Sequence, residues 1–419
     1  MKNYLAQLTR AARRNVSTKN TSSNRTLAAV QEVESRMLGA SHPAITPTAN
    51  YSCPARNPMI QPRWWTGKAP LASSQYAIDC SGYDMTKKIP ELEKQMIDIY
   101  RQHGVIMLTN TGLTDLEAST RWAQVIKDYV SENYSGGFGK YTGGANSRWP
   151  VAPNVYDTGA PLTAHLHYHH EMTYVSKSVP MIAFACSKHV EGKGYTYISD
   201  GFGTTDAILK TPLGQKLKEK GVCFIRCLTD KNQFKDVEVG WNGKDQKGVY
   251  NHWQTSFGVE TKEEVEKLAQ ERGLTCEWGP NNYLKTKYKV SAFEYSPLFD
   301  RNLLYSSLAD DAMWFDTWPG VDELPVFEKF EGATMHERPL KMTYGDGTEF
   351  TREELLTYID VYDQYGLEIQ WKTGDVVAID NLRWAHGRPE CILKEGEERF
   401  LGVMLGPHFD RQGCRADKW

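Results

Sequence analysis

The sequence contains no apolar run that approaches the roughly 20 residues needed to span a membrane. It also has no marked excess of charge, since 49 lysines and arginines accompany 52 aspartates and glutamates, for a formal net charge of -3. A broad basic field of the kind that attracts nucleic acids is therefore missing. These absences predict no membrane and no nucleic acid among the partners, and they leave a homo-oligomer open.

Paired cysteine motifs are absent as well. The eight cysteines are scattered, none of them lies in a Cys-x-x-Cys pair, and Cys223 with Cys227 lacks the second half of a zinc-binding pattern. Scattered cysteines are typical of free thiols in a reducing compartment, so we expect a cytoplasmic location.

The first 31 positions contain no acidic residue, six basic residues and many serines, threonines and asparagines. This composition is found in organelle transit peptides, and equally in a basic arm that packs on the enzyme or on a partner subunit. An organelle is therefore the alternative location. We expect residues 1–75 to form a basic, irregular N-terminal extension.

Residues 76–419 are predicted to form a single domain with a helical insertion at about 204–365. Helical periodicity predicts helices at 92–100, 114–130, 204–218, 262–272 and 351–363. Thr114 and Thr351 are the expected N-caps, with Glu117 and Glu354 as capping-box partners. Short apolar or alternating runs predict strands at 104–109, 164–175, 181–186, 195–199, 368–371, 375–380 and 399–405.

No glycine-rich phosphate loop follows any of these strands, which argues against alternating βαβ units. We therefore expect a mainly β fold with helical insertions.

Histidines are concentrated in one segment, since five of the eleven fall between residues 165 and 189. Side chains alternate between the two faces of a strand, so the odd-numbered residues of 165–171 are predicted to share one face. These residues are His165, His167, His169 and Glu171. Two histidines and one carboxylate, with open coordination positions, are typical of non-haem iron(II) oxygenases.

The His-x-acid spacing alone decides nothing, because the chain contains it three times, at His169, His189 and His408. The discriminating half of the pattern lies later. An apolar strand is predicted at 375–380, and His386 follows it six residues later. Asn381 is expected to fix the loop between this strand and His386. Arg399 comes 13 residues after His386. We expect Arg399 on the hairpin partner of the His386 strand, where its guanidinium could grip a distal carboxylate such as that of 2-oxoglutarate.

These motifs resemble the TauD/TfdA superfamily of iron(II)/2-oxoglutarate oxygenases, in particular its clavaminate-synthase-like branch. The resemblance covers about residues 90–407. It rests on segments 169–174, 194–200, 344–347, 374–381 and 386–388, and on Arg399. It implies a double-stranded β-helix (jelly-roll) core flanked by α-helices.

The resemblance also implies roles for individual residues. His169, Glu171 and His386 would hold the iron, and Arg399 would anchor the distal carboxylate of 2-oxoglutarate. Thr196, 27 residues after His169, would hydrogen-bond the same carboxylate. One departure is Lys193, where the family has the first glycine of a Gly-Gly-x-Thr turn.

The expected reaction uses Fe(II), 2-oxoglutarate and O2 to oxidise an unactivated C–H bond of a small polar substrate, amino-acid-like or acid-bearing. Hydroxylation, desaturation and oxidative cyclisation, as in a kainoid synthase, all fit, whereas the carboxylate of Glu171 argues against a halogenase. The candidate substrate-binding residues are His167, Arg148, Arg383 and Arg388.

Two alternatives stay open at this point. The first is a catabolic hydroxylase of a sulfonate, phosphonate or betaine-like acid. The second is a non-oxidative jelly-roll metal protein or zinc hydrolase, because zinc sites also use histidine and glutamate.

Overall fold

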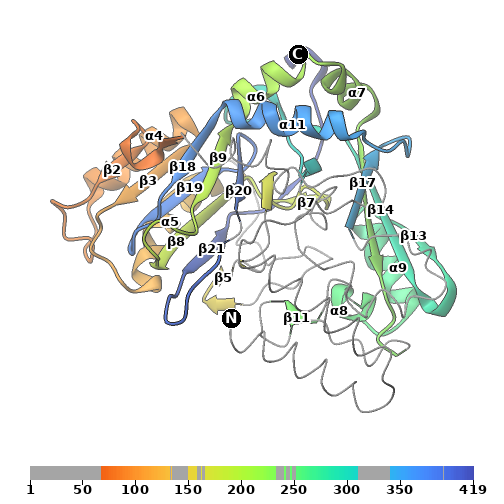
Figure 1. The fold of residues 1–419 in the computed structure, drawn as a ribbon, viewed down its shortest axis with the longest axis horizontal. Coiled ribbons are helices and arrows are strands. Elements are labelled where there is room, and N and C mark those ends of the chain that lie inside the picture. The colour runs from red at the N-terminus through yellow and green to blue at the C-terminus, as the bar shows by residue number, and fades with distance from the viewer. Residues whose placement is uncertain are drawn as a thin grey trace.

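Two facing β-sheets form the core of the protein (Figure 1). The computed structural model describes residues 68–132, 134, 150–157, 162, 166–232, 240–241, 246–247, 252–309, 340–389 and 391–419. The larger sheet contains, in spatial order, β2 (Ala77–Asp79), β3 (Val105–Thr109), β19 (Val376–Asp380), β8 (Met181–Lys188), β21 (Phe400–Leu405), β5 (Val155–Tyr156) and β4 (Pro150–Ala152). The smaller contains β1 (Ala69–Pro70), β18 (Gly366–Ile369), β9 (Thr196–Asp200), β20 (Trp384–Arg388) and β6 (Leu166–His169).

Strand β19 shows why the sequence folds in layers. All five of its residues are buried, because both faces of the strand are covered. Val377 and Ile379 point into the core between the two sheets, whereas Val376 and Ala378 pack in a second apolar cluster under α4 (Pro90–His103) and α5 (Leu116–Ser131). A short, continuous apolar run is what such a doubly covered strand requires.

A second lobe lies on the right in Figure 1 and falls largely within the expected insertion. It contains a four-stranded sheet with helices packed on it, so the insertion is not purely helical. Its strands, in spatial order, are β13 (Thr275–Trp278), β14 (Leu284–Val290), β10 (Val222–Leu228) and β17 (Leu340–Tyr344). Its helices include α8 (Trp253–Phe257) and α9 (Lys262–Glu271).

Three further helices, α6 (Gly201–Ile208), α7 (Pro212–Lys220) and α11 (Arg352–Gln364), line the top of the molecule in Figure 1. The remaining short pairs are β15 (Phe293–Ser296) with β16 (Arg301–Leu304), β7 (Lys177–Ser178) with β22 (Phe409–Asp410), and β11 (Gly240–Trp241) with β12 (Gln246–Lys247). The fold is mainly β with helical parts around a jelly-roll core.

The capping box predicted at Thr351 and Glu354 is confirmed. The other predicted cap is wrong by one residue: Asp115, not Thr114, caps α5 by accepting from the backbone N–H of Ala118. A carboxylate also interacts favourably with the positive end of the helix dipole, which a hydroxyl does less strongly.

The helix expected at 204–218 is two helices, α6 and α7. Thr211 caps α7 and Pro212 occupies its first turn. Proline cannot donate the hydrogen bond that would continue α6 through this point.

Two expectations about strands are also wrong. The strand expected at 164–175 ends at His169, so Glu171 lies in a turn rather than on the strand face. Strands β20 and β21 are not hairpin partners, because β20 pairs with β6 and β9 whereas β21 pairs with β8 and β5. His386 therefore lies in the smaller sheet, whereas Arg399 immediately precedes a strand of the facing, larger sheet.

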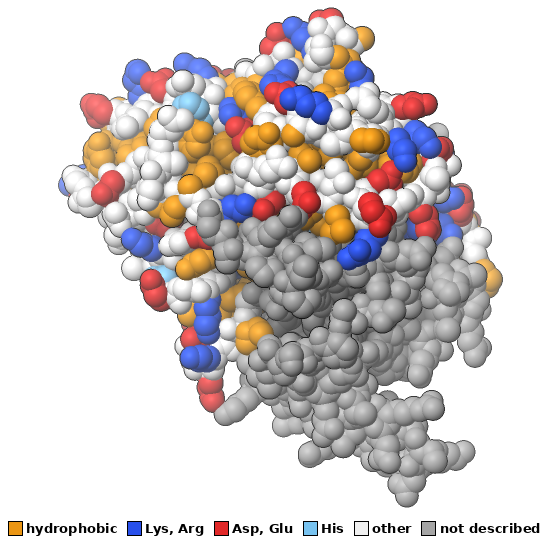
Figure 2. Space-filling model, turned by 45° about the horizontal axis from the view of Figure 1, so that its top comes forward, with side chains coloured by type: hydrophobic (Ala, Val, Ile, Leu, Met, Phe, Trp, Pro, Cys, Tyr) orange, Lys and Arg blue, Asp and Glu red, His pale blue; other side chains and the backbone are white. Residues whose placement is uncertain are grey.

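Among the described residues, no helix is both long and apolar enough to cross a bilayer. Figure 2 shows acidic and basic side chains interspersed over the described part of one face, with no extended patch of a single sign there.

Candidate active site

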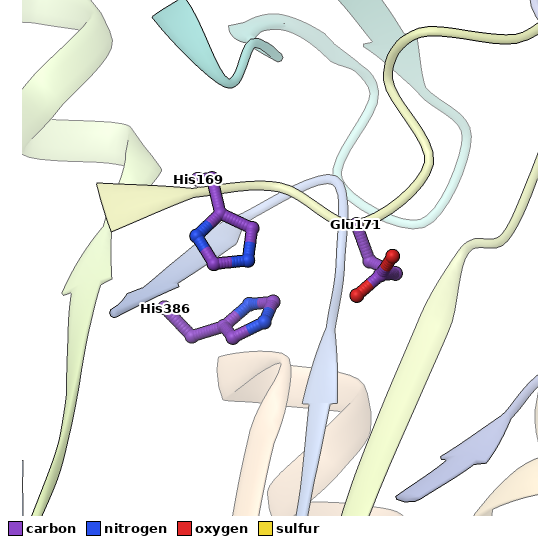
Figure 3. Close-up of side chains that lie close together, drawn as sticks. All are labelled: His169, Glu171 and His386. Carbon is purple, nitrogen blue, oxygen red and sulfur yellow. The ribbon is translucent and has the colours of Figure 1, made fainter. Parts of the chain in front are cut away.

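His169 and His386 lie directly opposite each other on neighbouring strands. β6 and β20 are antiparallel, and their register pairs these two residues. The centroids of the two imidazole rings are 4.2 Å apart. The side chain of Glu171, from the turn after β6, points toward both rings (Figure 3). In the part of the chain that the structure describes, these three side chains form a group whose ligand atoms all lie within 4.8 Å of one another.

The donor set fits iron(II). The Nδ1 atom of His169 lies 2.7 Å from the carbonyl oxygen of His167. Because a carbonyl can only accept, Nδ1 carries the hydrogen and Nε2 keeps its lone pair for a metal. Two imidazoles and one carboxylate supply three ligands and leave coordination positions open, as expected of a non-haem iron centre.

Asn381 fixes the backbone of Glu171. Its side-chain oxygen accepts from the Glu171 N–H at 2.8 Å, and its side-chain nitrogen donates to the Glu171 carbonyl at 2.9 Å. The Tyr305 hydroxyl donates to the same carbonyl at 3.1 Å. Asn381 lies in the loop before His386, and its side-chain nitrogen also donates to the Val179 carbonyl at 2.8 Å. These hydrogen bonds tie the loop to distant backbone, in agreement with the expectation from the sequence, and the same amide replaces a strand neighbour for Glu171, which has left the sheet.

His167 and His170 are buried outside the metal-binding group. Burial lowers the pKa of each imidazole to about 3, so both are neutral. Nδ1 of His170 lies 3.1 Å from the Ser306 carbonyl oxygen and 3.2 Å from the Ser306 backbone nitrogen, and its ring lies against Tyr305.

Arg399 comes immediately before β21 and is held by Gly194. Its Nε donates to the Gly194 carbonyl at 2.8 Å. Gly194 has a φ of +66°, and a Cβ at this position would overlap the Cδ and Nε atoms of Arg399. Glycine is therefore required both by the backbone conformation and by the close approach of the arginine.

The surroundings of Arg399 fit an anionic ligand. The residue is 9% exposed, and burial lowers the pKa of its guanidinium. No carboxylate among the described residues forms an ion pair with it. A buried cation is costly without a counter-charge, so the site favours a carboxylate supplied from outside.

Thr196, at the start of β9, is oriented by Trp371. The indole Nε1 donates to the Thr196 hydroxyl oxygen at 2.9 Å, which leaves the hydroxyl hydrogen free to donate to another acceptor. Phe184 lies between Trp371 and His386, with ring centroids 6.2 and 5.4 Å from theirs. Trp371 and Phe184 lie at the candidate site, although the sequence analysis did not single them out. For Trp371, the signal that could have been used is its position as an aromatic residue just before the Gly374 turn.

The candidate substrate cations are placed differently from one another. Arg383 forms a bidentate ion pair with Asp200, both bonds 2.8 Å long, so its charge is balanced within the fold. Arg388 is buried, its Nη1 donates to the Leu162 carbonyl at 2.7 Å, and it acts electrostatically, like Arg399, on the thiol of Cys391. Arg148 and His165 lie outside the described residues.

Comparisons with known proteins bear on this geometry. The family model described as "Taurine catabolism dioxygenase TauD, TfdA family" matches residues 69–405, most of the chain. The chain belongs to this family.

Two curated relatives are similar in sequence to this member of the TauD/TfdA family. The dapdiamide synthesis protein DdaC of Enterobacter agglomerans is 24% identical over 318 residues, 74% of this chain and 85% of that protein. The clavaminate synthase-like protein At3g21360 of Arabidopsis thaliana is 22% identical over 250 residues, 59% of this chain and 68% of that protein. A crystal structure of a taurine dioxygenase from Burkholderia xenovorans is 14% identical, over 84% of this chain and 92% of that one, with a TM-score of 0.43.

Membership of the TauD/TfdA family confirms the resemblance. The protein is a 2-oxoglutarate-dependent dioxygenase that uses Fe(II) and O2. A non-oxidative jelly-roll protein or a zinc hydrolase is not compatible with this membership.

Proposed function

We propose that His169, Glu171 and His386 hold the iron and that Arg399 and Thr196 hold the distal carboxylate of 2-oxoglutarate. The observation that carries this proposal is the pairing of a compact His-His-Glu group with a buried arginine that has no described carboxylate partner. A zinc or purely structural site has no use for such an arginine. When bound, iron with 2-oxoglutarate and O2 supplies the oxidation of an unactivated C–H bond, releasing succinate and CO2.

The residues of this chain would bind, orient and exclude water. The His169 ring is oriented by the His167 carbonyl, and Glu171 is oriented by Asn381. Thr196 would donate to a carboxylate oxygen with the hydrogen that Trp371 leaves free. The apolar ring of Phe184 would keep water from the space beside His386, where a reactive centre needs protection.

For the substrate, we propose a small polar acid of specialised metabolism, amino-acid-like or otherwise acid-bearing. The similarity to a dapdiamide synthesis protein supports the specialised role. Hydroxylation, desaturation and ring closure all belong to this proposal, ring closure on an N-prenylated glutamate by a kainoid-type synthase included. Arg148, Arg383, Arg388 and His167 stay the candidates for substrate contact. Arg383 is the weakest of them because Asp200 already pairs with it, whereas Arg388, like Arg399, acts on the thiol of Cys391.

The family description names taurine catabolism, which favours one alternative: a catabolic hydroxylase of a sulfonate, phosphonate or betaine-like acid. Substrate-stimulated succinate release separates the two. Stimulation by amino-acid-derived acids supports a specialised role, and stimulation by sulfonates, phosphonates or betaines alone supports the catabolic one. A cytoplasmic location also stays a proposal, to be tested by fluorescence microscopy of the tagged full chain.

The metal assignment is tested by adding iron(II) and 2-oxoglutarate without oxygen. We expect the weak visible charge-transfer band of the chelate in the wild type and its loss in His386→Ala. His189→Ala is the matched control, because His189 belongs to another His-x-Glu pair, with Glu191 almost fully exposed. A wild type without the band, or a band that persists in His386→Ala, contradicts the proposal.

A further inference from the structure

The segment after residue 405, beyond the part of the chain that matches the family model, packs against the turn that carries Glu171. Strand β22 pairs with β7, and the Arg411 N–H donates to the Ser176 carbonyl at 2.8 Å. Residues far apart in sequence thus lie side by side next to the turn that carries Glu171.

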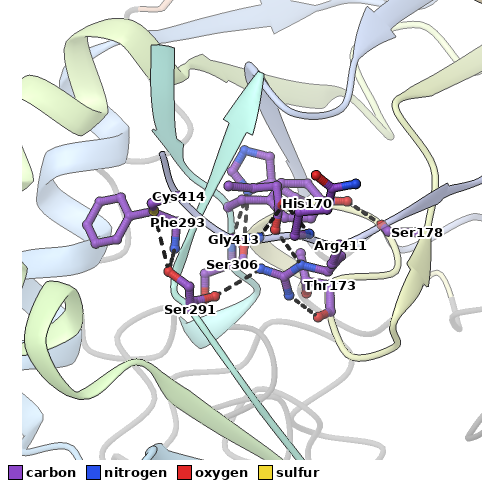
Figure 4. Close-up of polar contacts among 12 residues, drawn as sticks. His170, Thr173, Ser178, Ser291, Phe293, Ser306, Arg411, Gly413 and Cys414 are labelled. Atoms are coloured by element: carbon purple, nitrogen blue, oxygen red, sulfur yellow. Dashed lines mark hydrogen bonds and ion pairs between the residues drawn. The ribbon is translucent and has the colours of Figure 1, made fainter. Parts of the chain in front are cut away.

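The Arg411 guanidinium joins three elements (Figure 4). Its Nη1 donates to the Thr173 carbonyl at 2.6 Å, two residues after Glu171. Its Nη2 donates to the Ser291 carbonyl at 2.9 Å, and its Nε to Glu294 on β15 at 3.0 Å. The guanidinium also lies 4.9 Å from the centre of the Tyr305 ring, whose hydroxyl bonds the Glu171 carbonyl.

Glu294 completes this arrangement from the other side. Its second carboxylate oxygen accepts from the backbone N–H groups of Gln412 and Gly413, both at 2.8 Å. The side chains of Arg411 and Glu294 are 0% and 2% exposed, so the ion pair is buried. A buried pair of this kind holds one arrangement because each charge loses its partner in any other.

The turn needs such support because Met172, next to Glu171, has a φ of +58° and a fully buried side chain. A non-glycine residue in this region is strained and persists only where its surroundings hold it. Asn381 holds the turn at Glu171, and Arg411 holds it at Thr173 and Ser176.

We propose that Arg411 is a positioning residue that fixes the Glu171 turn and thereby keeps the Glu171 carboxylate in place for the metal. The proposal rests on the assignment of Glu171 as a ligand. Residues that orient metal ligands typically change metal affinity roughly 10- to 100-fold when they are replaced.

The test is a titration of iron(II) into the folded, metal-free full chain without oxygen, with the melting temperature measured in parallel. Arg411→Met alone leaves Glu294 as an unpaired buried charge, so the main variant combines it with Glu294→Gln. The glutamine oxygen can still accept from Gln412 and Gly413. We expect the double variant to bind iron(II) roughly 10- to 100-fold more weakly.

Two controls separate positioning from general stability. Arg415→Met changes an exposed arginine of the same segment, which stacks over Tyr295. Val265→Ala weakens the separate apolar cluster under α9 and lowers stability away from the site. Both should bind iron(II) like the wild type.

The iron(II) affinities of these variants decide between the possible roles of Arg411. Unchanged iron affinity in the double variant overturns the proposal, as does an equal loss of affinity in Val265→Ala. Glu171→Ala tests the ligand assignment separately from the role of Arg411. If this variant binds iron(II) like the wild type, the assignment of Glu171 as a ligand is wrong. If Glu171→Ala loses iron but the double variant does not, only the role of Arg411 is refuted.

Discussion

Replacing Gly194 by alanine should weaken 2-oxoglutarate binding more than any comparable change in the same turn. The new Cβ would overlap the Cδ and Nε atoms of Arg399, and the φ of +66° strains any residue but glycine. The guanidinium would have to move, and it would lose both the Gly194 carbonyl and its alignment with the carboxylate of the ligand.

The expected change in the dissociation constant of 2-oxoglutarate follows from the loss of one hydrogen bond to the charged guanidinium of Arg399. A hydrogen bond to a charged group contributes about 1.5–3 kcal/mol. Since roughly 1.4 kcal/mol corresponds to a factor of ten, the dissociation constant of 2-oxoglutarate should rise roughly 10- to 100-fold. An anaerobic titration of 2-oxoglutarate into the iron-loaded enzyme, followed by the charge-transfer band, measures this constant directly.

Gly192→Ala is the matched control. Gly192 has a φ of +70° in the same turn, but a Cβ there would meet nothing within 4 Å. It therefore carries the backbone strain without the contact to Arg399. If Gly194→Ala and Gly192→Ala bind 2-oxoglutarate equally well, the reasoning about Arg399 is refuted.

Two further predictions concern Thr196, at the start of β9, and Asp380, at the end of β19. Thr196→Val removes the proposed donor to 2-oxoglutarate and leaves the Trp371 N–H without its acceptor. The KM for 2-oxoglutarate should therefore rise roughly tenfold. An unchanged KM would show that the Thr196 hydroxyl does not bind 2-oxoglutarate. Burial raises the pKa of Asp380 to about 7, so its proton stabilises the folded state at low pH and this stabilisation is lost as the pH rises from about 4 to about 7. Asp380→Asn stays neutral and keeps the oxygen that accepts from the Leu382 and Arg383 N–H groups. Its melting temperature relative to the wild type should therefore increase between about pH 5 and pH 8 at fixed metal loading, and a constant difference would contradict the pKa shift.

Local interactions made much of the fold predictable. The capping box joins Thr351 and Glu354, which are only three positions apart, so it depends on local interactions alone. The apolar run of β19 predicts a strand because both of its faces need burial. The three proposed metal ligands were predicted differently: the His-x-acid spacing occurs three times in the chain, so the resemblance to the TauD/TfdA family was needed to choose among them.

Contacts between distant segments account for what the sequence did not predict. Glu171 leaves the strand because Asn381, 210 residues later, takes up its backbone groups. Arg399 lies opposite the sheet of His386 rather than beside it, because the connection after β20 crosses to the facing sheet. The pair of Arg411 and Glu294 spans 117 residues, and no local pattern marks either partner.

With His169, Glu171 and His386 as the proposed ligands, the pairing of β6 with β20 also predicts when the enzyme can acquire its metal during synthesis. A nascent chain that has emerged only as far as β19 carries His169 and Glu171 but not the imidazole that lies opposite them. Domains fold as their segments leave the ribosome, and pairings between distant segments form last. Iron should therefore be taken up only after translation has passed β20, and prematurely terminated chains should be released without metal.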